Sequence, residues 1–205
     1  ANALVQWTTT YTSPGTNNDM GRSIAVDAAN NVYVAGIEDR SDLGQLYNLW
    51  VRKYVFFTAP AGCGLVKNIK KDGSADYATI QAAINGLPAT LTTNTCLVIR
   101  DTQTYPEQVT VQGFTNNGYR INIMADPTFA SSAPVLSPPA ASTAAFVIHN
   151  ASVTLAGIHV LGTNSMPYGV LASSAYIVMS SVNVNSGGNI YTAGISMSSW
   201  SAVSY

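Results

Sequence analysis

Charged side chains are scarce in this sequence. Lys, Arg, Asp and Glu make up 9% of the 205 residues and leave a net charge of −1, whereas an average globular protein has about 25% charged residues. So little positive charge excludes the electrostatic attraction on which binding to nucleic acid or to an anionic membrane surface depends. A surface this close to neutral also promotes self-association.

Long hydrophobic runs are absent too, although 47% of the residues are hydrophobic. No apolar run approaches the roughly 18 residues of a transmembrane helix, so we expect no membrane span. No signal peptide is recognisable and the first residue is Ala1, which indicates a removed leader or a piece of a longer chain. The abundant Ser, Thr, Asn and Tyr are common outside cells, and they predict an extracellular or cell-surface location.

Cysteine is nearly absent: the sequence has only Cys63 and Cys96. In a secreted protein an even pair predicts one disulfide. Two buried free thiols remain the alternative.

Short strands and tight turns characterise residues 1–54. A strand begins at Leu4, and period-2 alternation predicts three more strands at residues 23–27, 31–36 and 49–54. The segment resembles one blade of the bacterial SBBP-type β-propeller repeat, and the matching residues are Trp7 and residues 21–27, 31–36 and 51–54. The resemblance implies a small antiparallel sheet, present here in one copy, whereas propellers usually close with about 4–8 blades.

A linker at residues 55–73 and a short helix at residues 76–86 are expected next. The linker holds the one local basic cluster (Lys67, Lys70 and Lys71), which we interpret as solvated rather than as a binding patch. Asp76 can cap the start of the helix and Gly86 can end it. One face of this helix is apolar and consists of Ile80, Ala83, Ile84 and Leu87.

A repeat follows the helix. Residues 150–160 align with residues 174–184 at an offset of 24 residues, and residues 199–204 begin a third copy about 25 residues later. A period in this range is typical of a solenoid, and three short strands per turn describe a parallel β-helix.

Residues 66–205 resemble the start of the pectin-lyase-like right-handed β-helix, and in particular the N-terminal pattern of pectinesterases. The matching residues are 71–77, 79–84 and 104–109. The resemblance implies that the helix caps the open end of the solenoid. Together with the SBBP-like segment, it is similar to a portion of very large bacterial surface proteins.

Catalytic groups are missing from the part of the chain where such a fold would carry them. Glycan-cleaving enzymes need paired carboxylates, yet residues 127–205 contain no Asp, Glu, Lys or Arg. We interpret Glu107 as structural, and His149 and His159 as outward-facing strand residues. No metal site and no cofactor are predicted, because no spacing of Cys or His suggests zinc and Asp39 and Asp42 are too sparse for a calcium loop.

Three residues remain as weak candidates for contacts with carbohydrate. Tyr176 and Trp200 could present aromatic rings to sugars, although packing explains both as well, and Asn150 begins a formal glycosylation sequon. No ligand is identified by these residues.

The sequence therefore predicts an all-β protein in three parts. These are a single propeller-blade-like antiparallel sheet at 1–54, a linker at 55–73, and a right-handed parallel β-helix with an N-terminal capping α-helix at 74–205. The expected function is that of a non-catalytic extracellular scaffold that self-associates head-to-tail into filaments or continues into a longer chain. The alternatives are a carbohydrate-binding or adhesive surface module, and a fragment of a pectinesterase-like or lyase-like enzyme.

Overall fold

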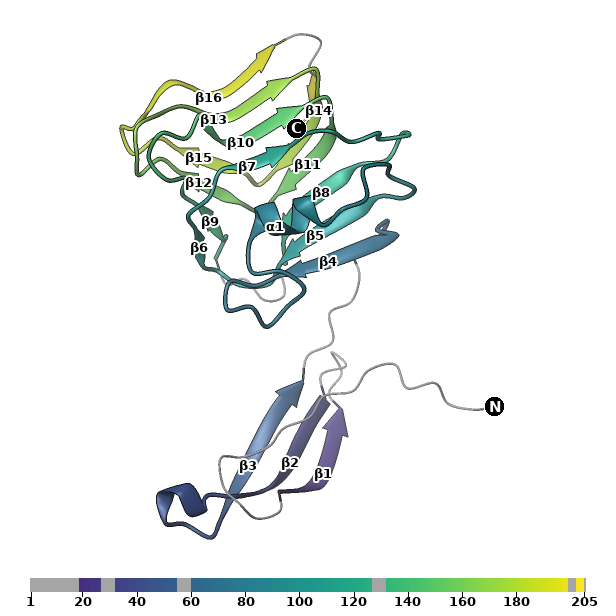
Figure 1. Cartoon of the computed structure of the whole chain (residues 1–205), viewed down its shortest axis with the longest axis vertical. Helices are drawn as coiled ribbons and strands as arrows, with labels where there is room; N and C mark the ends of the chain where they lie inside the picture. The colour runs from purple at the N-terminus through teal and green to yellow at the C-terminus, as the bar shows by residue number, and fades with distance from the viewer. Residues whose placement is uncertain (1–18, 27–31, 55–59, 127–131, 199–201, 205) are drawn as a thin grey trace. The chain divides into compact units, whose positions relative to one another are not determined.

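The computed structural model describes residues 19–26, 32–54, 60–126, 132–198 and 202–204. The chain forms two compact units, Ala1–Thr58 and Ala59–Tyr205. Both are built mainly from β-strands (Figure 1), so the all-β class is confirmed. The predicted strand at Leu4 and the candidate residue Trp200 lie outside the described residues.

The first unit contains a three-stranded antiparallel sheet. The strands are β1 (Met20–Val26), β2 (Val32–Asp39) and β3 (Tyr47–Tyr54), in that order across the sheet. Between β2 and β3 the 3-10 helix η1 (Ser41–Leu43) ends at Gly44, whose φ of 72° is accessible to glycine without strain. The three strands predicted by the period-2 pattern are thereby confirmed, together with their antiparallel pairing.

The second unit contains three parallel sheets. A six-stranded sheet consists of β4 (Leu65–Ile69), β5 (Thr95–Ile99), β8 (Ile121–Ala125), β11 (Ser152–Ala156), β14 (Tyr176–Ser180) and β17 (Ala202–Ser204). A second sheet consists of β7 (Val109–Val111), β10 (Ala144–His149), β13 (Met166–Ser173) and β16 (Ile190–Ser198). The third consists of β6 (Thr104–Tyr105), β9 (Val135–Leu136), β12 (His159–Leu161) and β15 (Asn183–Asn185).

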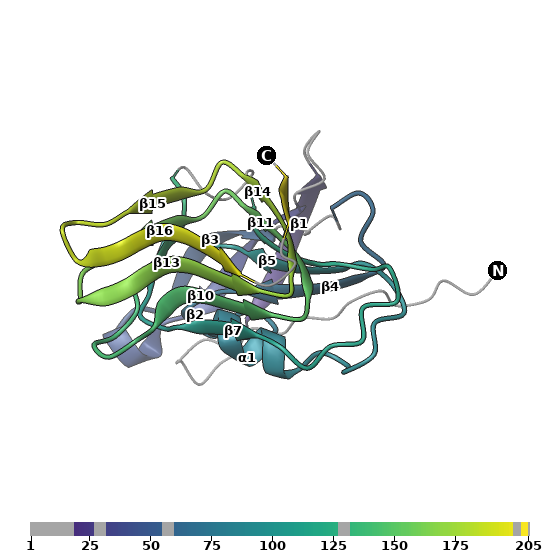
Figure 2. The same ribbon diagram turned by 90° about the horizontal axis from the view of Figure 1, so that it is seen from above.

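From β5 onward each pass of the chain adds one strand to each sheet, and Figures 1 and 2 show β7, β10, β13 and β16 side by side. Ser152 pairs with Tyr176 and His159 pairs with Asn183, so the repeat aligned in the sequence is the actual register of the strands. Tyr176 pairs in turn with Ala202, which places the third copy close to its predicted position. The described residues form parallel sheets but no closed solenoid.

Left-handed backbone conformations recur at the corners between strands. Asn150 and Ser174 precede β11 and β14 with φ of 48° and 49°. Gly157 and Ser181, with φ of 66° and 53°, follow the same two strands. Because this region of φ is open to few residue types, the corners explain why small and amide-bearing residues recur at these positions.

Apolar side chains from all three sheets share one core. Leu97, Ile123 and Leu155 occupy neighbouring positions on adjacent strands of the six-stranded sheet and are fully buried. Phe146 and Leu136 bring the other two sheets into the same cluster. Alternate residues along each strand point inward, as period 2 requires.

Helix α1 (Ile80–Asn85) lies against β7 and β5 and buries Ile80, Ala83 and Ile84 in this core. The apolar face and the end at Gly86 agree with the sequence. The predicted capping residue was wrong: Thr79, and not Asp76, accepts the N–H of Ala82. Asp76 instead accepts the backbone N–H of Asn68 at 2.7 Å, because the helix begins a turn later than the pattern suggested.

Part of the expected linker is a strand. Leu65–Ile69 forms β4, which pairs in parallel with β5 and places Ile69 in the core. The composition of 55–73 indicated a loop because β4 is short and contains a lysine. Pairing with β5, which comes after helix α1 in the chain, supplies its hydrogen bonds.

Candidate functional site

A shallow polar groove lies at the beginning of β11 and β14. Its volume is about 300 Å³, and its lining is Asn116, Asn150, Ala151, Ser152, Ser174, Ala175 and Tyr176. We call it the Tyr176 groove. The left-handed corners at Asn150 and Ser174 turn the chain here, and the pairing of Ser152 with Tyr176 sets their side chains beside each other.

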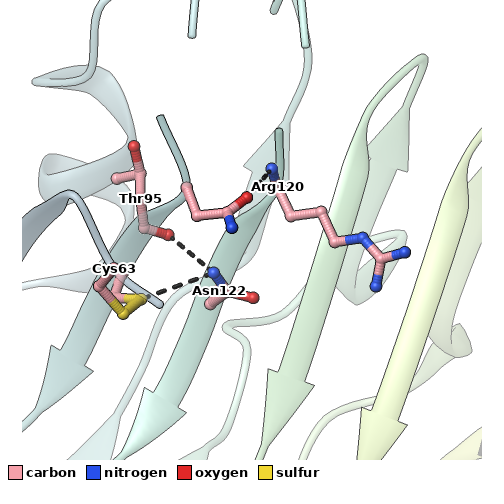
Figure 3. The surroundings of a disulfide bond; sticks show 6 residues. Cys63, Thr95, Arg120 and Asn122 are labelled. Atoms are coloured by element: carbon pink, nitrogen blue, oxygen red, sulfur yellow. Dashed lines mark hydrogen bonds between the residues drawn. A yellow bond between two sulfur atoms is a disulfide. The ribbon is translucent and has the colours of Figure 1, made fainter. Parts of the chain in front are cut away.

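Arg120 stacks on the ring of Tyr176, with its guanidinium carbon 4.5 Å from the ring centroid. Because Ile121 of β8 pairs with Val153 of β11, Arg120 lies next to Ser152. The small side chain of Ser152 lets Arg120 extend past β11 to Tyr176 on β14. The backbone N–H of Arg120 donates to Asn94 Oδ1 at 3.0 Å, and Figure 3 shows the side chain extending from there toward the neighbouring strands. A cation over an aromatic face stabilises the ring orientation.

Asn116 contributes an acceptor without a partner. Its carboxamide oxygen Oδ1 is buried, and within the described part of the chain no group donates to it. A buried acceptor that lacks a donor destabilises a fold by about 1–3 kcal/mol. Asn116 is also one of the residues that line the groove.

The structure brings together two of the sequence-predicted candidates, Tyr176 and Asn150, in this one groove. Asn150 is exposed, as a glycosylation sequon requires, and its modification stays a prediction. Sequence reasoning missed Asn116 and Arg120. The repeat that aligns β11 with β14 does not extend to them, because the connection from β8 to β11 is longer than the connection from β11 to β14.

The five carboxylates of the second unit all make contacts inside the fold. Asp126 pairs with Arg100 in a buried ion pair. Asp101 accepts the backbone N–H of Lys71 at 2.7 Å and the hydroxyl of Tyr105 at 2.9 Å. The remaining three are Asp72, which pairs with Lys70, Asp76, which accepts from Asn68, and Glu107, which accepts from helix α1.

Burial and pairing shift the pKa values of several of these groups. Burial lowers the pKa of Arg100, and the hydrogen bond and charge of Asp126 oppose that effect. Burial, followed by the contact with Asp101, raises the pKa of the Tyr105 hydroxyl. The Lys70 hydrogen bond holds the pKa of the exposed Asp72 well below its usual range. Each of these shifts follows from burial or from a contact within the fold.

Glu107 holds the start of helix α1. Its two carboxylate oxygens accept the N–H groups of Ile80 at 2.8 Å and Gln81 at 2.9 Å. Burial raises the pKa of the Glu107 carboxyl, and these two bonds act in the opposite direction. The helix in turn covers the edge of β7, where Gln81 accepts the N–H of Thr110 at 2.6 Å and donates to its carbonyl at 3.2 Å. This geometry agrees with a structural role for Glu107.

The predicted disulfide between Cys63 and Cys96 is present (Figure 3). It ties the segment preceding β4 to β5, with the two Cα atoms 5.7 Å apart. Asn122, beside Cys96 in the sheet, donates to the carbonyl of Thr95 at 3.3 Å. The disulfide therefore fixes the start of β4, the edge strand of the six-stranded sheet, to its neighbour β5.

The histidines and lysines singled out in the sequence form no common site. His149 is exposed at the end of β10, and His159 is half-buried on β12. Lys70 pairs with Asp72, while Lys71 donates to the carbonyl of Thr104, so the basic cluster is partly used in local contacts. Within the described ranges, no three His, Cys, Asp or Glu side chains gather as a metal site would require.

Comparisons with protein-family models, with curated proteins and with solved structures found no match to this chain. No helix in the described part of the chain is long and apolar enough to span a membrane.

Proposed function

We propose that this protein is a non-catalytic extracellular scaffold that self-associates through one end of its second unit. On this proposal the second unit is a right-handed parallel β-helix similar to the pectin-lyase-like fold, and the first is a propeller-like blade of the SBBP type. Three parallel sheets that gain one strand per pass support the former, and the three-stranded antiparallel sheet supports the latter.

The observation that carries the proposal is that the core is uncovered at β16. Phe146, Val170 and Ile195 pair in sequence across β10, β13 and β16 and form one column of side chains. The first two are fully buried, but Ile195 is 42% exposed. In the same way, Met197 on β16 pairs with the buried Ala172 on β13, and Met197 is also exposed.

The opposite end of the same sheet has a cover. There β7 supplies Val109 and Val111, which are fully buried, and helix α1 packs Ile80 and Ile84 beside them. Since uncovered apolar surface at a solenoid end favours stacking on another surface, we assign association to the β16 end. The edges of the three-stranded sheet, where β1 is exposed along its length, supply the complementary surface for a head-to-tail contact.

A structural rather than catalytic role fits the use of charge. The five carboxylates of the second unit are engaged with Arg100, Lys70, backbone N–H groups or a tyrosine hydroxyl. A general acid needs a carboxyl that is free to act on a substrate, whereas each of these carboxyls already has a partner within the chain. The disulfide fits the oxidising setting outside the cell.

Sedimentation velocity over a concentration series tests the proposal. The wild-type chain should form larger species as its concentration rises, and the double variant Ile195→Lys/Met197→Lys should stay smaller at every concentration. Ala82→Lys places one such positive charge at an exposed position of helix α1, at the covered end, and should associate like wild type. Circular-dichroism melting checks that all variants fold. A wild-type chain that remains one small species throughout, or a Lys pair that associates normally, would contradict the proposal.

A further inference from the structure

We propose that the Tyr176 groove is a binding site for a neutral saccharide. The inference goes beyond the scaffold role and does not depend on self-association, because the groove lies on β11 and β14 and not on β16.

The polar side chains that line the groove are suited to hydrogen bonds with hydroxyl groups. Its polar side chains are two carboxamides, two hydroxyls and one phenol, from Asn116, Asn150, Ser152, Ser174 and Tyr176. Each of these side chains can both donate and accept hydrogen bonds. Sugar hydroxyls have the same dual character, so a pyranose can satisfy several of them at once.

The side chains that line the groove carry no formal charge: none of the lining residues is a lysine, arginine, aspartate or glutamate. Arg120 lies beside the groove and is stacked on the ring of Tyr176. An uncharged lining of donors and acceptors suits a neutral ligand that is rich in hydroxyl groups.

Tyr176 supplies an apolar surface for the ligand. The residue is 37% exposed, and Arg120, which precedes β8, stacks on its ring across the intervening strand β11. A rigid aromatic side chain provides contact area at little entropic cost. A volume of about 300 Å³ is at the lower end for ligand sites and suits one or two sugar rings.

NMR titration of the full chain with neutral trisaccharides tests the inference. The probes are cellotriose, maltotriose and triacetylchitotriose, and trigalacturonate and an Asn/Ser-rich peptide serve as the acidic and protein-like comparisons. At least one neutral probe should shift the amide signals of residues 150–152 and 174–176.

Variants then locate the site. Tyr176→Ala and Asn116→Ala should each weaken binding about tenfold, whereas Tyr176→Phe, which keeps the ring, should bind within about threefold of wild type. Tyr191→Ala removes a tyrosine that is 68% exposed on β16 and should leave binding unchanged. Thermal melting of Tyr176→Ala separates lost binding from lost folding, with Tyr176→Phe as the folded comparison.

Three results would overturn the inference. One is the absence of any shift with the neutral probes at millimolar concentration. Another is equal loss of affinity in Tyr191→Ala and Tyr176→Ala. The last is binding of trigalacturonate or of the peptide without binding of a neutral sugar.

Discussion

The two units of this protein use apolar residues in opposite ways. In the second unit a large set of apolar side chains, among them Phe146 and Ile123, is fully buried. In the first unit Ile24 is 70% exposed and Leu49 is 78% exposed. The same residue types therefore form a core in one unit and an open surface in the other.

Pairing in the first unit shows that both faces of its sheet are apolar. Ile24 pairs with Val34, while Val51 pairs with Ala35, the next residue along β2. Because successive residues of a strand point to opposite faces, Ile24 and Val51 lie on opposite sides of the sheet, and both are exposed. Apolar side chains that stay exposed on both faces add little hydrophobic stabilisation to these three strands. We therefore expect most of the hydrophobic stabilisation of the described residues to come from the second unit.

Truncation of a core residue should give the largest difference between the units. Phe146→Ala removes a buried ring and should lower the free energy of unfolding by about 3–5 kcal/mol. Leu49→Ala, in the first unit, should change it by less than about 0.5 kcal/mol. Urea unfolding followed by circular dichroism measures both. Equal losses would mean that the first unit has a core that its exposure does not reveal.

Loss of the disulfide should have the next largest effect, again confined to the second unit. Replacing Cys63 and Cys96 together by alanine releases a cross-link between residues 33 apart and should destabilise the protein by about 3 kcal/mol in the loop-entropy account. Reduction of the wild-type protein should reproduce the shift in the urea midpoint. A midpoint that is unchanged after verified reduction would show that β4 is held by its pairing with β5 alone.

Substitution of Glu107 tests the covered end of the second unit, because this residue anchors helix α1 there. Glu107→Ala leaves two helix N–H groups without acceptors and should lower stability by about 1–3 kcal/mol. Glu107→Gln keeps an acceptor and should lower it less.

The pH dependence of the same pair of proteins has a defined sign. Burial raises the pKa of Glu107 above its ordinary 4.5, so the folded state binds the proton more tightly than the unfolded state does. The resulting stabilisation is complete below pH 4.5 and is lost as the pH rises through the raised pKa. Wild type should therefore be most stable relative to Glu107→Gln in acid. A stability difference that does not vary with pH would contradict a buried, ionisable contact.

The sequence predicted the strands of the first unit and the register of the repeat because each leaves a local signal, and it predicted the disulfide because the chain has only two cysteines. Alternation marked β1, β2 and β3, and the internal repeat placed β11 beside β14. It did not predict β4 or the cap at Thr79, because the partners that fix them, β5 and Glu107, lie far from them along the chain.

The candidate site was predicted only in part for the same reason. Tyr176 and Asn150 were visible as an aromatic residue and a sequon. Asn116 lines the groove and Arg120 contacts the ring of Tyr176. Both residues precede β8, and the longer connection between β8 and β11 interrupts the period. No alignment of repeats within the chain could place them there.

Hydrogen–deuterium exchange at two protein concentrations, about 1 and 200 µM, tests the central claim most directly. The account predicts that amides of β5, β8 and β11 exchange slowly at both concentrations. Amides of β16 and of β1 should exchange faster in the dilute sample and become protected in the concentrated one, because association covers these edges. Protection of β16 and β1 that is the same at both concentrations, in a sample that contains one species, would contradict a scaffold that associates through its uncovered end.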